Sequence, residues 1–315
     1  MTTLIHQMSL LAIAPWIQPL WIVAVAALVA LAFLLGTYYA LVFVLPKVAA
    51  VARTTAKEAV LQPIFWVLLL FGSGAIVLFI ILPYNTFGED IKMFKDTGLT
   101  LIMLLSIILA LWTASVSIAE EIEGRTALTL LSKPISRREF VIGKFLGILG
   151  PVTLMFIILG TVFLCSISAK VPYDARENSQ LNPDAIKCTL EILSVFPGLV
   201  LAWLEVIVFT SIGVAISTRL QMQANLVICV TVYALGHLGP LLVQSTVGEN
   251  PIVRFVGSLF ATVLPVLDHF NIQAAVSAGV PVPPEYLAWA ALYCLIYTTI
   301  MMLIALALFE NRDLA

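Results

Sequence analysis

The chain has 315 residues and a formal net charge of −2, and 61% of its residues are hydrophobic whereas only 11% are charged. A soluble protein carries about 25% charged residues, so this composition indicates a protein whose solvent is lipid. The small negative net charge excludes the strongly basic balance that electrostatic binding of nucleic acid requires, and no nucleic-acid partner is expected.

Seven apolar runs divide the chain, and each approaches the roughly 20 residues that a helix needs to cross a bilayer. All are predicted to be helices, because unpaired backbone groups in lipid are too costly for open strands. No Lys or Arg precedes the first run, unlike a secretory signal, so we interpret it as a membrane anchor. The runs are 17–45, 63–82, 98–118, 145–168, 192–217, 224–246 and 286–309.

The distribution of Lys and Arg predicts the orientation of these helices. With the N-terminus outside, ten of the 16 basic residues fall on the inner side and six on the outer side, and the inner segments are the shorter ones. The positive-inside rule therefore predicts a multi-pass protein of the cell (inner) membrane, with its N-terminus outside and its C-terminus in the cytoplasm.

The segment between the first two runs is amphipathic. Arg53 and Lys57 share one helical face, and another face carries Val48, Val51 and Thr55. Two readings stay open for it. It is either a short interfacial helix that ends before Pro63, or a continuation of the first span into water.

The outer segment 248–285 differs from the other loops in character. It opens with Asn250 and Pro251, which are typical of a helix start, and it is apolar apart from Arg254 as far as residue 264. A stretch too short to span the membrane but too apolar for open water predicts helices that lie in, or re-enter, the outer leaflet.

The four cysteines show no metal-ligand spacing, and no metal site is expected. Cys165 and Cys188 both fall near the predicted outer face, where an oxidising compartment would favour a disulfide. The alternative is that each is a small buried hydrophobic residue.

The stretch between the third and fourth runs concentrates charge. Glu120, Glu121 and Glu123 lie at the C-terminal end of a membrane helix, where they oppose the helix dipole, so something other than helix stability must favour them. Glu121 and Arg125 have the favourable i, i+4 order, which predicts that the helix continues through the loop.

The same stretch then turns back toward the membrane. Pro134 interrupts the helix, and Ser136 and Glu139 have the spacing of a capping box that starts the next span. The result is a charged helical hairpin, fixed to two membrane helices, that is suited to pass motion from a soluble partner into the bilayer. A solvated loop that merely follows the positive-inside rule is the competing interpretation.

The exact residues favour the first interpretation. Glu-Glu-Ile-Glu-Gly-Arg-Thr at 120–126 and Leu-Leu-Ser-Lys-Pro-Ile-Ser-Arg-Arg-Glu-Phe at 130–140 closely resemble the cytoplasmic coupling segment of type-2 ATP-binding-cassette (ABC) exporter permeases. In that family, an acidic helix and a proline turn dock on the nucleotide-binding subunit. The chain around 56–63 is also similar to the family's elbow helix, and 308–314 to its C-terminal ending.

The resemblance implies an all-α integral membrane protein with a six-helix permease core at 47–315 and one extra N-terminal transmembrane segment at 1–46. It implies an exporter subunit without catalytic residues or cofactors of its own. ATP and Mg would be handled by a separate ATPase subunit, and a second permease copy or a homologue would complete the assembly within membrane lipid. The implied coupling residues are Glu120, Glu121, Glu123, Arg125, Thr126, Leu128, Leu130, Leu131, Pro134, Ser136 and Arg137.

The sequence also bears on the competing functions. It contains no G-x-x-x-x-G-K-[ST] motif, so the chain has no P-loop to cradle ATP phosphates. A membrane-embedded enzyme is disfavoured, because no H-E-x-x-H or G-x-S-x-G motif and no paired intramembrane aspartates occur.

Two ionisable residues fall in the middle of predicted spans, Glu205 in the fifth run and His237 in the sixth. A carboxylate at mid-membrane costs a few kcal/mol on insertion scales, so we expect the two side chains to face the bundle and approach each other. They act either as an ion relay in a secondary transporter or channel, or as structural glue in which a protonated Glu205 bonds a neighbouring helix.

Glycines recur along one side of the fourth run, at Gly143, Gly147 and Gly150. Small residues at this spacing allow two helix backbones to approach closely. They predict either ordinary packing within the chain or a contact between subunits.

Overall fold

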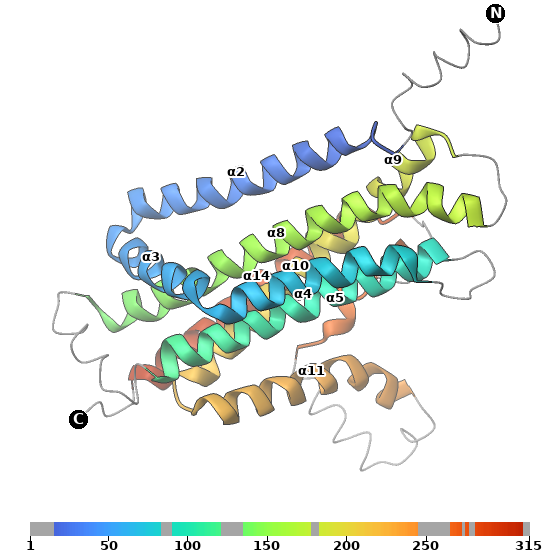
Figure 1. The fold of residues 1–315 in the computed structure, drawn as a ribbon. Helices are drawn as coiled ribbons and strands as arrows, with labels where there is room; N and C mark the ends of the chain where they lie inside the picture. The colour runs from blue at the N-terminus through green and yellow to red at the C-terminus, as the bar shows by residue number, and fades with distance from the viewer. Residues whose placement is uncertain are drawn as a thin grey trace, which may run out of the picture.

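The structure is a computed structural model, and it describes residues 16–82, 90–120, 135–177, 183–244, 265–272, 275–276 and 281–310. Every regular element in these ranges is a helix, as the apolar runs predict (Figure 1). The elements are α2 (Leu20–Val44), α3 (Pro46–Leu61), α4 (Pro63–Ile81), α5 (Asp90–Ala114), η1 (Ser115–Glu120), α8 (Arg137–Glu177), α9 (Ala185–Leu193), α10 (Phe196–Ser217), α11 (Met222–Gln244), η3 (Leu267–Phe270) and α14 (Pro284–Glu310).

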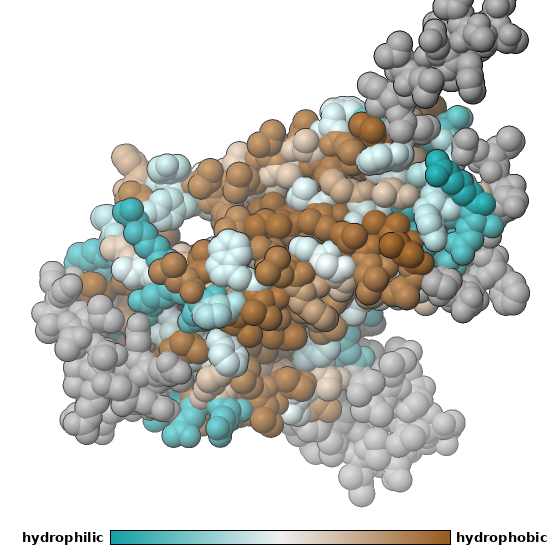
Figure 2. All heavy atoms as spheres, viewed as in Figure 1, coloured by the Kyte–Doolittle hydropathy of each residue, from teal (hydrophilic) through white to brown (hydrophobic). Residues whose placement is uncertain are grey.

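Six helices among the described residues are long and apolar enough to cross a membrane, and Met222–His237 of α11 adds a shorter apolar stretch. Figure 2 shows hydrophobic side chains gathered over the middle of the molecule and hydrophilic ones toward its two ends. This belt is what a lipid-solvated bundle requires, because lipid tails are as apolar as the side chains that face them. The chain is therefore a multi-pass α-helical membrane protein.

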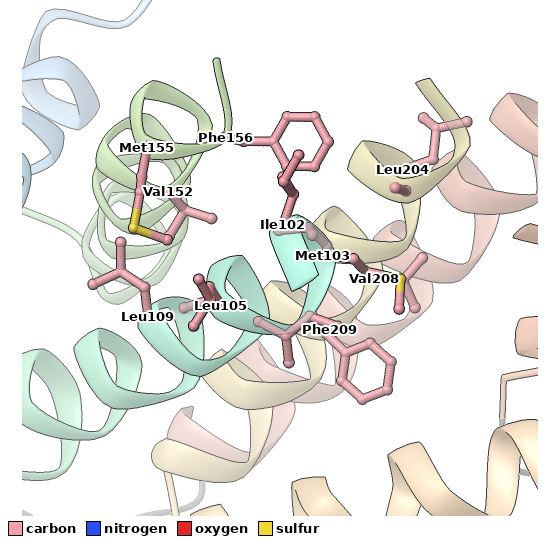
Figure 3. Close-up of a cluster of buried hydrophobic side chains, with 14 of the residues drawn as sticks. Ile102, Met103, Leu105, Leu109, Val152, Met155, Phe156, Leu204, Val208 and Phe209 are labelled. Carbon is pink, nitrogen blue, oxygen red and sulfur yellow. The ribbon is translucent and has the colours of Figure 1, made fainter. Parts of the chain in front are cut away.

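The core lies where α5, α8 and α10 pack together. Figure 3 shows the side chains of α5 between those of α8 and α10. The most apolar stretches of these helices are mostly buried, as expected for central helices, whereas few residues in those of α2, α4 and α14 are buried. The labelled core residues are Ile102, Met103, Leu105, Leu109, Val152, Met155, Phe156, Leu204, Val208 and Phe209.

The segment after α2 forms a separate short helix, the first of the two readings left open by its sequence. Leu45 leaves the helical conformation with φ −134° and ψ 71°, and Pro46 then occupies the first turn of α3, where a missing N–H costs nothing. At its other end, Gln62 is extended because Pro63 follows it. Figure 1 shows α3 turning back from α2 toward α8.

Two of the three glycines in the fourth run let α3 pack closely on α8. A Cβ at Gly143 would lie 2.7 Å from the Cβ of Val51, and one at Gly147 would lie 2.7 Å from the carbonyl oxygen of Ala52. A Cβ at Gly150 would meet nothing within 4 Å. Gly143 and Gly147 therefore serve packing within the chain.

Two helices extend beyond the apolar runs that predict them. Lys95 in α5 and Lys170 in α8, which the sequence assigns to outer segments, are both buried. Lys95 pairs with Glu191 and donates to Ser194 Oγ at 2.8 Å. Lys170 donates to the Ile80 carbonyl oxygen at 3.0 Å. Because each lysine has a partner far away in the sequence, its charge can be buried within a helix. Hydropathy alone would leave both residues outside the helices.

Two further predictions concern the outer-leaflet helices and the pair Cys165 and Cys188. The predicted outer-leaflet helices at 250–264 lie outside the described residues. Cys165 and Cys188 are free thiols, and Cys188 is fully buried.

Candidate functional site

The predicted coupling segment is described at its two ends only. Residues 121–134 lie outside the described part of the chain, and with them the predicted contact residues Glu121, Glu123, Arg125, Thr126, Leu128, Leu130, Leu131 and Pro134. At one end, the backbone of Glu120 closes η1, which continues α5. At the other end, Ser136 and Arg137 lead into α8. Both ends lie at the end of the bundle that carries α3.

The predicted capping box is present where α8 starts. The Ser136 amide donates to Glu139 Oε2 at 2.7 Å, and the Glu139 amide donates to Ser136 Oγ at 3.2 Å. These reciprocal bonds satisfy backbone donors that a helix start otherwise leaves without partners. They set the point at which the segment re-enters the membrane helix.

Arg137 connects this helix start to the end of the last helix. Its Nη1 atom donates to the carbonyl oxygen of Glu310 at 2.7 Å, which satisfies one of the orphan carbonyls at the end of α14. One turn further along, the ring of Phe140 stacks on the ring of Phe309, with centroids 5.5 Å apart. The beginning of α8 and the end of α14 are thus joined by a polar and an apolar contact.

On the other side of the segment, a buried amide joins three elements. Asn225 of α11 is fully buried, and its Nδ2 atom donates to Ser115 Oγ of η1 at 2.8 Å and to Ser217 Oγ of α10 at 2.7 Å. Each hydroxyl in turn donates to a backbone carbonyl of its own helix. A π-helix such as η1 is rare and is frequently found at functional sites.

Lys144 joins the two ends of the segment to each other. Its side chain is 3% exposed, and its Nζ atom donates to Ser117 Oγ of η1 at 2.9 Å while it lies 5.6 Å from the centre of the Phe140 ring. A displacement of residues 121–134 would therefore act directly on η1 and α8. The bonds of Asn225 and Arg137 would carry it to α10, α11 and α14.

Of these linking residues, Asn225 and Lys144 are not among the coupling residues that the sequence predicts. Asn225 lies at the start of an apolar run and Lys144 in a charged loop, and both read as ordinary boundary residues. One general rule could have pointed to Asn225 and Lys144: polar side chains at the ends of membrane helices form hydrogen bonds across helices when they face the bundle. Whether such a side chain faces the bundle depends on the rotation of its helix about its own axis. A single sequence does not determine this rotation.

The predicted mid-membrane pair is brought together. Glu205 is 1% exposed, and its Oε1 atom lies 3.5 Å from His237 Nε2. The Nδ1 atom of His237 lies 3.2 Å from the carbonyl oxygen of Tyr233, which can only accept, so Nδ1 carries a proton. With the proton on Nδ1, both Nε2 and an ionised Glu205 carboxylate can only accept. Their contact is therefore favourable when the pair holds one more proton, on Nε2 or on the carboxyl group.

The pair is loosely joined in this conformation. Its 3.5 Å separation is at the limit for a hydrogen bond, and Glu205 Oε1 has no hydrogen-bond partner by geometry among the described residues. The ring of His237 packs 4.5 Å from that of Tyr233, which in turn packs 5.5 Å from Phe209. Two aromatic rings thus pack in series beside His237.

The helical bundle and its hydrophobic belt define a multi-pass membrane protein. Comparison with known families agrees with this architecture. The model of the ABC-2 family transporter protein matches residues 81–314, about three quarters of the chain. The chain belongs to this family, and it is a membrane-spanning permease of an ATP-binding-cassette transporter, a subunit that is not itself catalytic. Curated proteins give no match.

Proposed function

We propose that this permease exports its substrate with energy from a separate ATPase subunit that docks on residues 120–137. The observation that carries the proposal is the set of polar contacts between helices near the two ends of this segment. Asn225, Lys144 and Arg137 tie its two ends to α10, α11 and α14. A peripheral loop without a mechanical role would not need the buried side chains of Asn225 and Lys144 beside it, since each such polar group is costly to bury unless it is bonded.

Each part of the segment has a role in this proposal. Glu120, Glu121, Glu123 and Arg125 contact or orient the ATPase, and Leu128, Leu130 and Leu131 offer it an apolar docking face. ATP and Mg bind in the partner subunit. When the ATPase closes on nucleotide, the segment shifts, and η1 and α8 transmit the shift to the other spans as a rigid-body movement.

The assembly contains a second permease copy or a homologue, and the substrate moves outward along the interface between the two. The proposed orientation has the α3 end of the bundle in the cytoplasm of a cell (inner) membrane, because basic residues are denser there. Residues 1–46 are proposed as an addition to a permease unit at 47–315, since a six-helix core needs no span before α3.

A second candidate function is supported by the contact between Glu205 and His237. Two titratable groups in contact at mid-membrane are able to relay a proton in a secondary transporter or channel. This function predicts transport that follows an ion gradient in vesicles lacking any ATPase. Loss of transport with an ionophore, at constant ATP, would favour the relay over the ATP-driven mechanism.

Co-purification tests the main proposal. The chain is extracted from its native membrane in mild detergent, and co-purifying proteins are identified by mass spectrometry. We expect a P-loop ATPase with the unaltered chain, and its loss from a variant in which Glu120, Glu121 and Glu123 are changed to Ala.

A matched control removes the same number of charges at the opposite end of the bundle. Asp184, Glu177 and Glu285 are exposed there, and their joint change to Ala should leave the ATPase bound. If no P-loop ATPase appears with the unaltered chain even after cross-linking, the proposal is wrong.

A further inference from the structure

A large cavity lies between the first helix and the rest of the bundle. It has a volume of about 1130 Å³ and is lined by residues of α2, α3 and α8 and by Trp203 of α10. The volume exceeds the roughly 300–1,000 Å³ of typical small-ligand pockets. Figure 1 shows α2 and α3 meeting at an angle beside α8. Residues of all three helices line the cavity.

Two contacts join this part of the chain to the bundle. Near its start, the carbonyl oxygen of Trp16 accepts a hydrogen bond of 2.6 Å from Ser168. Near its middle, the ring of Phe33 meets that of Trp203 edge to face, with centroids 6.4 Å apart. Open apolar space inside a membrane fills with lipid rather than with water.

The lining of the cavity has an apolar part and a positively charged part. Most of the wall is apolar, from residues such as Leu34, Leu41, Leu146 and Leu149. The end formed by α3 carries Arg53 and Lys57, which share a helix face and are both exposed. Among the described residues, no carboxylate forms an ion pair with either of them. The cavity therefore joins an apolar slot to a pair of cations at the membrane surface.

We propose that this cavity binds an anionic phospholipid of the cytoplasmic leaflet. Its phosphate and headgroup lie at Arg53 and Lys57, and its acyl chains lie in the slot between α2 and α8. Basic pockets between membrane helices bind acidic lipid headgroups in this way. The leaflet named here rests on the orientation proposed above, whereas the binding chemistry is independent of the ATPase.

The space available to the acyl chains continues past the cavity. A smaller cavity of about 210 Å³ follows α2 further along the bundle, and the two share Phe33, Thr153 and Trp203 in their walls. An acyl chain is long and thin, unlike a compact soluble ligand, so a slot of this shape matches it. The lipid would fill the gap that α2 leaves and hold α2 and α3 in place as one unit.

Native mass spectrometry of the purified chain in mild detergent tests the proposal, with phosphatidylglycerol and phosphatidylcholine of identical acyl chains as the two probes. We expect one phosphatidylglycerol molecule to be retained with at least about tenfold preference over phosphatidylcholine. Changing Arg53 and Lys57 together to Gln should reduce this preference to about one. A Gly150→Leu variant should reduce the retention of both lipids, because Gly150 lines the cavity and a Cβ there meets nothing within 4 Å.

Two controls match these variants. Arg138→Gln with Arg219→Gln removes two exposed cations outside the cavity, and Gly74→Leu adds the same side chain at another open helical glycine. Both should bind phosphatidylglycerol as the unaltered chain does. Equal retention of the two lipids by the unaltered chain would overturn the proposal, as would a preference that survives the loss of Arg53 and Lys57. So would an equal loss in the control variants.

Discussion

Gly147 of α8 lies directly against Ala52 of α3, so that a Cβ on the glycine would stand 2.7 Å from the Ala52 carbonyl oxygen and 3.0 Å from its Cα. Both neighbours are backbone atoms, which cannot rotate away as a side chain can. The close approach fixes α3 on α8, and α8 is the helix that leads out of the predicted coupling segment.

A Gly147→Ala variant should therefore separate α3 from α8 and lower the free energy of unfolding by about 1–3 kcal/mol. Thermal unfolding in detergent measures this as a lower Tm. Gly150→Ala is the matched control, since its new methyl group meets nothing within 4 Å. Equal Tm values for the two variants would show that α3 does not pack on α8 in this way.

Asn225 should contribute to stability well beyond an ordinary polar residue at a helix start. An Asn225→Ala variant leaves the buried hydroxyls of Ser115 and Ser217 without their donor, which should cost about 1–3 kcal/mol. Gln223 is exposed on the same helix and serves as the control position. Hydrogen exchange of the η1 amides should rise in the Asn225 variant alone, and unchanged exchange would contradict the described network.

The contact between Glu205 and His237 predicts that their variants are not additive. Either single substitution removes the contact, so the second substitution has no contact left to remove. The unfolding free energies of Glu205→Ala, His237→Ala and the double variant should therefore show an interaction energy of about 0.5–3 kcal/mol. Unfolding of the purified chain in detergent supplies the three values. Strict additivity would mean that the two side chains do not interact.

The proposed orientation predicts which ends of α8 are accessible from outside. Arg138 and Glu177 are both exposed, and they lie at opposite ends of this membrane-spanning helix. A cysteine at Glu177 should react with a membrane-impermeant maleimide on intact cells, and a cysteine at Arg138 should react only after permeabilisation. The unaltered chain gives the background from its four cysteines. The reverse pattern would invert the proposed topology.

The features that could be predicted from the sequence are those that depend on residues close together along the chain. The capping box needs only Ser136 and Glu139 at the right spacing, and hydropathy alone identifies the spans. The approach of Glu205 to His237 was predictable because two consecutive spans carry one costly mid-membrane group each, and each group needs a partner.

What could not be predicted depends on partners far apart in sequence. Lys95 and Lys170 read as outer-loop charges because Glu191 and the Ile80 carbonyl oxygen are about 90 residues away from them. The role of Asn225 depends on which face of α11 meets η1. The cavity beside α2 arises from the angle between α2 and α3, which Leu45 and Pro46 permit but do not determine.

The most direct test of the account is a site-specific photo-cross-link from residue 130, in the middle of the predicted coupling segment. A photoreactive phenylalanine derivative replaces Leu130, and a second chain carries it at Leu193, which is exposed at the opposite end of the bundle. Illumination of native membranes should link the first chain, and not the second, to a protein with a P-loop ATPase sequence. Cross-links from residue 130 to lipid or to this chain alone would contradict the coupling of this permease to an ATPase through residues 120–137.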